Sequence, residues 1–221
     1  MRYLVFSDTH LDTTFQASRL YRLEEAIDNC DRVIINGDFW NYNRCDLSDF
    51  LKSRWSLLFA KLKAKHTIYI YGNHDLAEWN DSRVEEFSDK QKLKFKLRSG
   101  QRRFVITHGD KLVLPGYKAP WFIRMDRKLH LTDVLDALTF TGEKLFGRVG
   151  ISERLLQSYN ERIKAQLSKH FRKKHFLVTG HTHKQEFDLQ SRYANCGLFD
   201  YGRAEYMYID DGQVELVKRA Y

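Results

Sequence analysis

The feature that most constrains this chain is a set of five polar blocks, each placed at the end of a run rich in β-branched and aromatic residues. The runs cover residues 2–6, 33–35, 67–71, 104–107 and 176–179, and their length and composition predict β-strands. Ligands of open α/β sheets bind beyond the carboxyl ends of the strands, so these side chains are expected to meet in one cleft. The blocks are Asp8-Thr9-His10, Gly37-Asp38, Gly72-Asn73-His74-Asp75, Thr107-His108-Gly109-Asp110 and Gly180-His181-Thr182-His183.

Helix-like stretches separate the first strand-like runs. Residues 16–29 and 47–64 carry apolar side chains at three- and four-residue spacing, which is typical of amphipathic helices. Strand-like runs return near the carboxyl terminus at residues 193–195, 205–209 and 214–217, with Asp210-Asp211-Gly212 as a predicted hairpin turn. This alternation predicts an α/β fold class.

The composition favours a folded, soluble protein. A hydrophobic content of 43% in 221 residues is sufficient for one well-filled core. No run approaches the roughly 20 apolar residues of a membrane span, and the amino terminus is too short an apolar stretch for a signal peptide. The three cysteines form no CxxC pair, so neither a disulfide framework nor a zinc ribbon is indicated. We therefore expect a cytoplasmic protein.

The excess positive charge is concentrated in one segment. Residues 111–175 hold 14 Lys and Arg against 6 Asp and Glu, whereas the remainder of the chain is neutral in sum. This segment is helical in character and has no strand signal. We predict a core formed by residues 1–110 and 176–221, and a basic helical insertion at 111–175 over or near the active site.

The chemistry of the five blocks points to metal binding. A single histidine is more often a hydrogen-bonded or exposed residue than a ligand, but here five of nine histidines lie at predicted strand ends beside Gly, Asp or Asn. Imidazole and carboxylate donors without thiolate suit Mn, Fe, Zn or Co.

The ordered set D-x-H, G-D, G-N-H-[DE], H-G-D and G-H-T-H resembles the signature of the calcineurin-like metallophosphoesterase superfamily. The resemblance implies a four-layer αββα sandwich and hydrolysis of phosphate esters or anhydrides with two divalent metal ions, Mn being favoured over Fe, Zn or Co. It assigns Asp8, His10 and His183 to one metal, with Asp38 as a bridge. It assigns Asn73, His108 and His181 to the other metal.

The resemblance gives His74 a different role, beside the metals as a catalytic residue that stabilises the phosphate or protonates the leaving oxygen. Relatives often pair this histidine with an Asp at the position of Asn41. An Asn orients the imidazole but stabilises its cation less than a carboxylate does. Asp75 and Asp110 are interpreted either as supporting residues or as participants, and the Asn195-Cys196-Gly197 turn has a counterpart in relatives.

Three interpretations of the basic insertion remain open. The first and favoured one is a lid that selects an amphipathic substrate, as in UDP-2,3-diacylglucosamine pyrophosphatases, which act on a lipid-linked substrate at the inner membrane. Peripheral attachment to an anionic membrane surface fits this interpretation. The second is a nucleic-acid grip in a nuclease or phosphodiesterase, and the third is a solvated helical face. A non-catalytic phosphoesterase-like binding subunit is the alternative to an enzyme.

Overall fold

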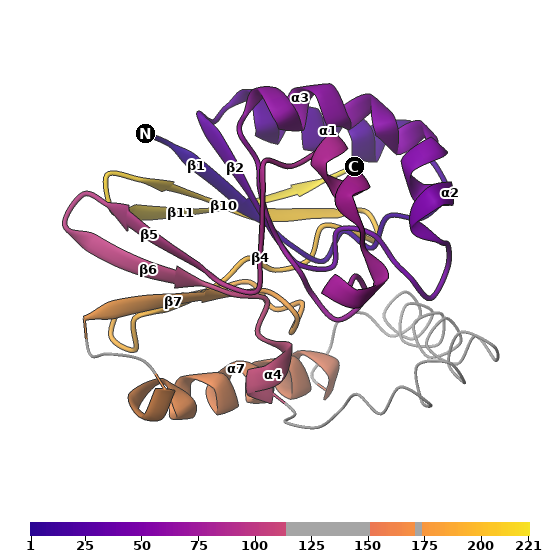
Figure 1. The fold of residues 1–221 in the computed structure, drawn as a ribbon. Helices are drawn as coiled ribbons and strands as arrows, with labels where there is room; N and C mark the ends of the chain where they lie inside the picture. Colours follow the sequence, from indigo (N-terminus) through magenta and orange to yellow (C-terminus); the bar gives the residue numbers. More distant parts are fainter. Residues whose placement is uncertain (114–150, 171–173) are drawn as a thin grey trace.

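The computed structural model describes residues 1–113, 151–170 and 174–221, which form two β-sheets packed face to face between helices (Figure 1). Residues 114–150, in the predicted insertion, lie outside the described residues, as do 171–173. Within the described residues the strand orders are β11-β10-β1-β2-β3-β4 and β5-β6-β7-β9-β8.

The first sheet has a parallel centre, β1 to β4, and an antiparallel hairpin at one edge. Its strands are β1 (Tyr3–Phe6), β2 (Arg32–Asn36), β3 (Ile68–Ile70), β4 (Lys90–Lys92), β10 (Arg203–Asp210) and β11 (Gln213–Ala220). The second sheet contains β5 (Phe95–Ser99), β6 (Arg102–Ile106), β7 (His175–Thr179), β8 (Glu186–Asp188) and β9 (Tyr193–Asn195). The helices are α1 (Ala17–Asp28), α2 (Leu47–Lys52), α3 (Phe59–Ala64), α4 (Asp110–Val113) and α7 (Ile151–His170), with short 3-10 helices η1 (Arg54–Leu58), η2 (Ala77–Trp79) and η3 (Ser82–Glu86).

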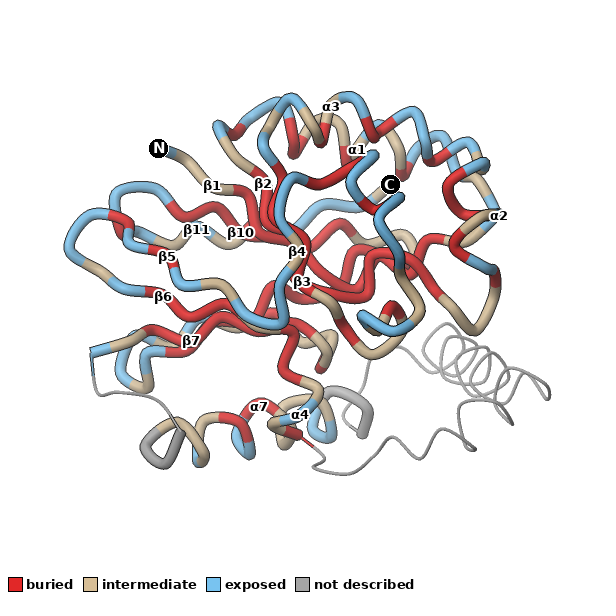
Figure 2. Tube along the Cα trace, viewed as in Figure 1, coloured by how far each residue is buried: buried red, intermediate tan, exposed pale blue. Residues whose placement is uncertain are grey.

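The central strands bury both faces, and the alternation of their side chains generates three separate apolar layers. In β1, Leu4 packs in the layer under α1 and α3, whereas Val5 packs in the layer between the two sheets. In β6, Phe104 joins the layer between the sheets, and its neighbour Val105 packs with Ile163 of α7 on the outer side. Successive side chains of a strand point to opposite faces, so one strand serves two layers. The predicted αββα sandwich is confirmed, and Figure 2 shows the buried strands at its centre.

The predicted helix over residues 47–64 is wrong in one respect, because the segment forms α2, η1 and α3 in succession. Ser53 breaks the helix with an extended backbone (φ −69°, ψ 169°), and its side chain accepts a hydrogen bond from the Trp55 amide. Serine competes for backbone groups in this way and therefore favours caps over helix interiors.

Strands β4, β5 and β8 were not predicted from the sequence. Strands β4 and β8 are three-residue edge strands with largely exposed or half-buried side chains. They are held by main-chain pairing to a neighbouring strand, so an apolar pattern does not mark them.

Helix α7 lies in the predicted insertion but packs against the second sheet (Figure 1). Ile163 is fully buried against Val105 and Leu177, so this helix forms the outer layer of the sandwich. The boundaries of the insertion stay a prediction. In the part of the chain that the structure describes, no helix is both long and apolar enough to cross a bilayer.

Candidate metal centre

All seven predicted metal ligands lie in loops that follow β1, β2, β3, β6 and β7. Three contiguous groups of potential donors form there, and in each group the ligand atoms lie within 4.8 Å of one another. The groups are Asp8–His10–His183, His10–Asp38–His74 and Asp38–His108–His181. His10 and Asp38 each belong to two groups, so the donors form one continuous cluster between the sheets.

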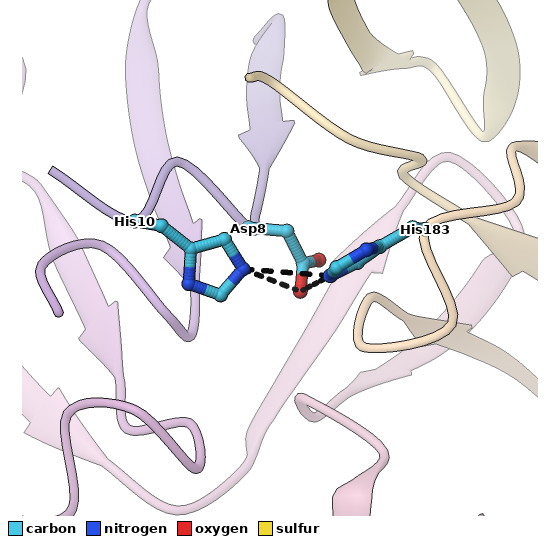
Figure 3. Close-up of side chains that lie close together, drawn as sticks. All are labelled: Asp8, His10 and His183. Atoms are coloured by element: carbon cyan, nitrogen blue, oxygen red, sulfur yellow. Dashed lines mark hydrogen bonds and ion pairs between the residues drawn. The ribbon is translucent and has the colours of Figure 1, made fainter. Parts of the chain in front are cut away.

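The first group is formed by loops far apart in the sequence (Figure 3). His183 Nε2 lies 3.3 Å from Asp8 Oδ1 and 3.4 Å from His10 Nε2, and His10 Nε2 lies 4.0 Å from Asp8 Oδ1. Donor atoms that share one ion at about 2.0–2.2 Å are separated by about 3–3.5 Å. The convergence of two imidazoles on one buried carboxylate oxygen therefore fits a cation.

The third group, Asp38–His108–His181, is centred on His108, whose ring is buried. His108 Nδ1 lies 2.9 Å from the main-chain oxygen of Asn36 and donates to it, which directs Nε2 into the cluster. Nε2 in turn lies 3.1 Å from Asp38 Oδ2 and 3.1 Å from Asn73 Oδ1. A carbonyl partner on one ring nitrogen is the usual way that metal-binding histidines are oriented.

Backbone conformation concentrates the donors in the cleft. Nine non-glycine residues in the described part of the chain have positive φ, and five of them are predicted ligands: Asp8, His10, Asp38, His181 and His183. This left-handed region costs roughly 1–2 kcal/mol for a residue with a side chain, and such conformations cluster at functional sites. The main-chain amides of Thr9 and His10 both donate to the oxygen of Asp38 at 2.9 Å, so the first two loops hold each other in place.

One buried atom of the cluster indicates where a cation would bind. Asp8 Oδ1, on which His183 Nε2 and His10 Nε2 converge, has no hydrogen-bond partner among the described residues. A buried carboxylate oxygen without a donor is costly, and a metal ion removes that cost. The donor set and this unsatisfied oxygen thus fit the divalent ions that the sequence predicts.

The pKa shifts within the cluster also favour a cation-binding site. Burial raises the pKa of Asp8, but His183 and His108 outweigh it and lower the pKa to about 2. Burial lowers the pKa of His108, but the carboxylates of Asp38 and Asp8 outweigh it and raise the pKa to about 10. Without metal, His108 therefore carries a proton between Asp38 and Asn73, in the position where these three residues would share a cation.

Comparison with known families identifies the chain. The family model of the calcineurin-like phosphoesterase superfamily domain matches residues 1–205. The chain belongs to this superfamily. The resemblance seen in the five sequence blocks is confirmed.

Several solved structures are similar to this superfamily member over nearly all of its length. An archaeal phosphodiesterase is 18% identical, covers 99% of this chain and 100% of its own, and has a TM-score of 0.48. The phosphoesterase YfcE from E. coli is 14% identical with coverage of 100% and 99% and a TM-score of 0.47. Vps29 from Entamoeba histolytica, complexed with zinc, is 14% identical with coverage of 100% and 99% and a TM-score of 0.44. At these identities and TM-scores the three structures carry no information about the activity of this chain. No curated protein matches it.

In this superfamily member, the predicted catalytic residue His74 lies against the cluster. Its Nδ1 is 3.3 Å from Asn41 Oδ1, and its ring centre is 4.7 Å from that of His10. The amide of Asn43 donates to the same Asn41 oxygen at 3.0 Å, which fixes the orientation of the Asn41 side chain. The structure thus brings His74 and Asn41 together as the sequence predicts; their roles stay predictions.

Asp75 is a supporting residue that ties two loops together. Its carboxylate accepts hydrogen bonds from the amides of Gly72 (2.6 Å), Asp38 (3.1 Å) and Phe39 (2.7 Å). Burial and the neighbouring Asp38 carboxylate raise its pKa to about 7. A cation on Asp38 would offset this repulsion. Of the two interpretations of Asp75, these contacts favour the supporting one.

Asn160 of α7 was not found by sequence analysis, because nothing in a helical sequence marks a contact with a distant loop. It is fully buried, and its Oδ1 accepts from Thr182 Oγ1 (2.6 Å) and Tyr193 OH (2.9 Å). Its Nδ2 donates to the main-chain oxygen of Lys184 at 3.1 Å. Thr182 lies between His181 and His183, so α7 holds the loop that carries two predicted ligands. Asn195 strengthens the same network by donating to Thr182 Oγ1 and to the main-chain oxygen of Gly180.

Proposed function

We propose that this protein is a dinuclear metal-dependent hydrolase of phosphate esters or anhydrides. The observation that supports it most directly is the position of Asp38, whose carboxylate belongs to two of the three donor groups. One carboxylate between two sets of imidazole donors is the arrangement expected for a bridge between two cations.

The proposed chemistry divides between the ions and the chain. Two divalent ions, with Mn favoured over Fe, Zn or Co, would act as Lewis acids on the phosphoryl oxygens and would lower the pKa of a bound water. One ion would be held by Asp8, His10 and His183. The other would be held by Asn73, His108 and His181, and Asp38 would contact both ions. His74, oriented by Asn41, would donate a hydrogen bond to the phosphoryl group or protonate the leaving oxygen.

Two substrate classes are proposed, in order. The first is an amphipathic nucleotide-linked substrate such as UDP-2,3-diacylglucosamine, cleaved as by a pyrophosphatase at an anionic inner-membrane surface. The aromatic and basic side chains that suggest it lie mainly in residues 114–150, outside the described residues. The second is a nucleic-acid or nucleotide phosphodiester, and the basic surface described in the next subsection favours it.

The test of catalysis is turnover of bis-p-nitrophenyl phosphate, p-nitrophenyl phosphate, a UDP-sugar, its acylated analogue and single-stranded DNA, with Mn²⁺ or with chelator. We expect chelator-sensitive hydrolysis that Asp38→Ala nearly abolishes while the protein stays folded. His74→Ala should lower the rate more than the metal content. An active Asp38→Ala protein would exclude the dinuclear mechanism, and loss of bound metal in His74→Ala would make His74 a ligand.

The alternative to an enzyme is a phosphoesterase-like binding subunit. The donor cluster includes every ligand position of the resemblance, which supports catalysis over this alternative. Absence of turnover with every substrate and with each of Mn, Fe, Zn and Co would favour the binding subunit.

A further inference from the structure

The segment from β4 to the start of β6 carries a dense positive charge outside the metal centre. Residues 90–103 contain seven Lys and Arg and no Asp or Glu. The chain outside residues 111–175 is neutral in sum, because acidic residues elsewhere compensate the charge of this segment. It covers the edge strands of both sheets, β4 and β5, and connects them.

Six of these cations have no acidic partner, unlike several other basic residues of the described surface. Lys61, Lys63 and Lys164, for example, each lie within 4.0 Å of a carboxylate. Within the described part of the chain, no ion pair or side-chain hydrogen bond involves the following six exposed residues: Lys90, Lys92, Lys94, Lys96, Arg98 and Arg103.

Three of the six form a row along β5 and the residue before it. Phe95 and Leu97 of β5 pack into the layer between the sheets, so Lys96 and Arg98 of the same strand point the other way. Lys94 lies directly before the strand and continues this alternation. Alternate residues of a strand are separated by about 6.8 Å. That separation is of the same order as the one between neighbouring phosphates of an extended nucleic-acid strand.

The row begins at the metal centre. Thr107, which precedes the predicted ligand His108, donates from Oγ1 to the main-chain oxygen of Leu93 at 3.2 Å. Lys94 follows Leu93 directly. At the other end Arg98 pairs with Arg103, five residues before His108 on β6, so the row extends roughly 17 Å away from the predicted ligand.

Protection of edge strands explains only part of this charge. Lysines on β4 and β5 discourage pairing with another chain. Arg103, however, lies on β6, which has a neighbour on each side, and directly opposite Arg98. Two like charges in such a cross-strand pair destabilise a sheet. A bound anion would offset the repulsion between Arg98 and Arg103. Protection of an edge strand does not require a second arginine on β6.

We propose that the basic row of Lys94, Lys96 and Arg98, extended by Arg103, binds the phosphate backbone of single-stranded nucleic acid and directs it toward the metal centre. A linear polyanion matches a single row of evenly spaced cations, whereas a membrane surface would favour a broad patch with apolar residues for insertion. The proposal rests on the proposed function for the cleavage that follows binding, but binding itself needs no metal.

The experiment measures binding of the full chain to a fluorescein-labelled 20-nucleotide oligo(dT) by anisotropy, in EDTA, between about 50 and 300 mM salt. The test variant is K94Q/K96Q/R98Q. The control is K52Q/K61Q/R219Q, which removes the same charge from other surfaces, including the edge strand β11. Thermal unfolding of both variants checks that they fold.

Each phosphate contact contributes about 0.7 to the slope of log K against log salt for a single strand. Loss of three contacts should therefore reduce the slope by about 2 and weaken binding at least tenfold at low salt, while the control keeps the slope of the unchanged protein. Equal slopes for the two variants, or no binding of oligo(dT) by the unchanged protein, would overturn the proposal. Binding to vesicles with 30% phosphatidylserine in place of oligo(dT) would also overturn it, in favour of a membrane surface.

Failure of the proposed function would look different. Turnover of bis-p-nitrophenyl phosphate by the unchanged protein with Mn²⁺, without oligo(dT) binding, refutes the basic row alone. Salt-dependent oligo(dT) binding that the test variant loses, without any turnover, supports the row and refutes the hydrolase.

Discussion

Replacement of Asn160 by Ala should weaken both the fold and the metal centre. The substitution removes the acceptor of the Thr182 hydroxyl and the side-chain donor to the Lys184 oxygen. The other three partners keep a contact, because Tyr193 OH retains Thr179, Glu186 retains Lys164, and the Asn195 amide retains the Gly180 oxygen. Each buried polar group left unsatisfied costs about 1–3 kcal/mol. With two such groups, we expect a loss of about 2–6 kcal/mol in the free energy of unfolding.

The effect on metal should be separable from the effect on stability. Thr182 lies between His181 and His183, and loss of a supporting contact behind a ligand typically lowers metal affinity 10–100-fold. Urea unfolding of the chelated protein measures the first effect, and competition with a chromophoric chelator measures the second. Ser158→Ala is the control, since the side chain of this half-buried residue of the same helix bonds, among the described residues, only to the Leu155 oxygen.

The expected stability loss for Ser158→Ala is within about 0.5 kcal/mol. If Asn160→Ala binds metal within twofold of the unchanged protein, α7 does not position the ligand loop. If its unfolding free energy changes by less than about 1 kcal/mol, the buried network contributes far less than its hydrogen bonds suggest.

Four further predictions concern the metal centre. Gly37→Ala should lower the free energy of unfolding in urea by about 2–4 kcal/mol, because φ is +86° and a Cβ would lie 2.5 Å from His108 Nδ1. An unchanged midpoint of urea unfolding would refute the close approach of Gly37 to His108. Metal binding should displace the His108 proton, whose pKa is about 10, so metal affinity should rise with pH below that value. Titration calorimetry in buffers of different ionisation enthalpy would detect the released proton. No proton release would contradict the assignment of His108 as a metal ligand. Because this pKa lies above the ordinary value of 6.5, the proton stabilises the metal-free fold fully below about pH 6.5, and this contribution is lost as pH rises through about 10. Chelation should lower the unfolding free energy by about 2.7 kcal/mol relative to protein at 100 times the metal dissociation constant, and an equal melting temperature with and without Mn²⁺ would show that the site binds no Mn²⁺.

Local sequence determined the strands of the core and the identity of the cluster. Runs such as residues 2–6 and 176–179 were predictable because a buried strand of a sandwich needs apolar side chains on both faces. The metal-binding residue types were equally visible, because ligand chemistry limits which side chains can occupy the strand ends. Parallel strands end at the same edge of a sheet, so the ligands after β1, β2 and β3 meet, and so do those after β6 and β7. The packing of the two sheets then brings the two sets together.

Tertiary structure alone decided what supports that cluster. Asn160 and Thr182 are 22 residues apart, and their hydrogen bond exists only because α7 packs across the second sheet. Strand β4 likewise has no apolar pattern and forms because β3 offers main-chain partners. The basic row was hidden for the same reason, since a lysine in the sequence does not show whether an acidic side chain lies beside it. Spacing along the chain specifies which face a residue occupies, but the partner on that face is set by which elements pack together.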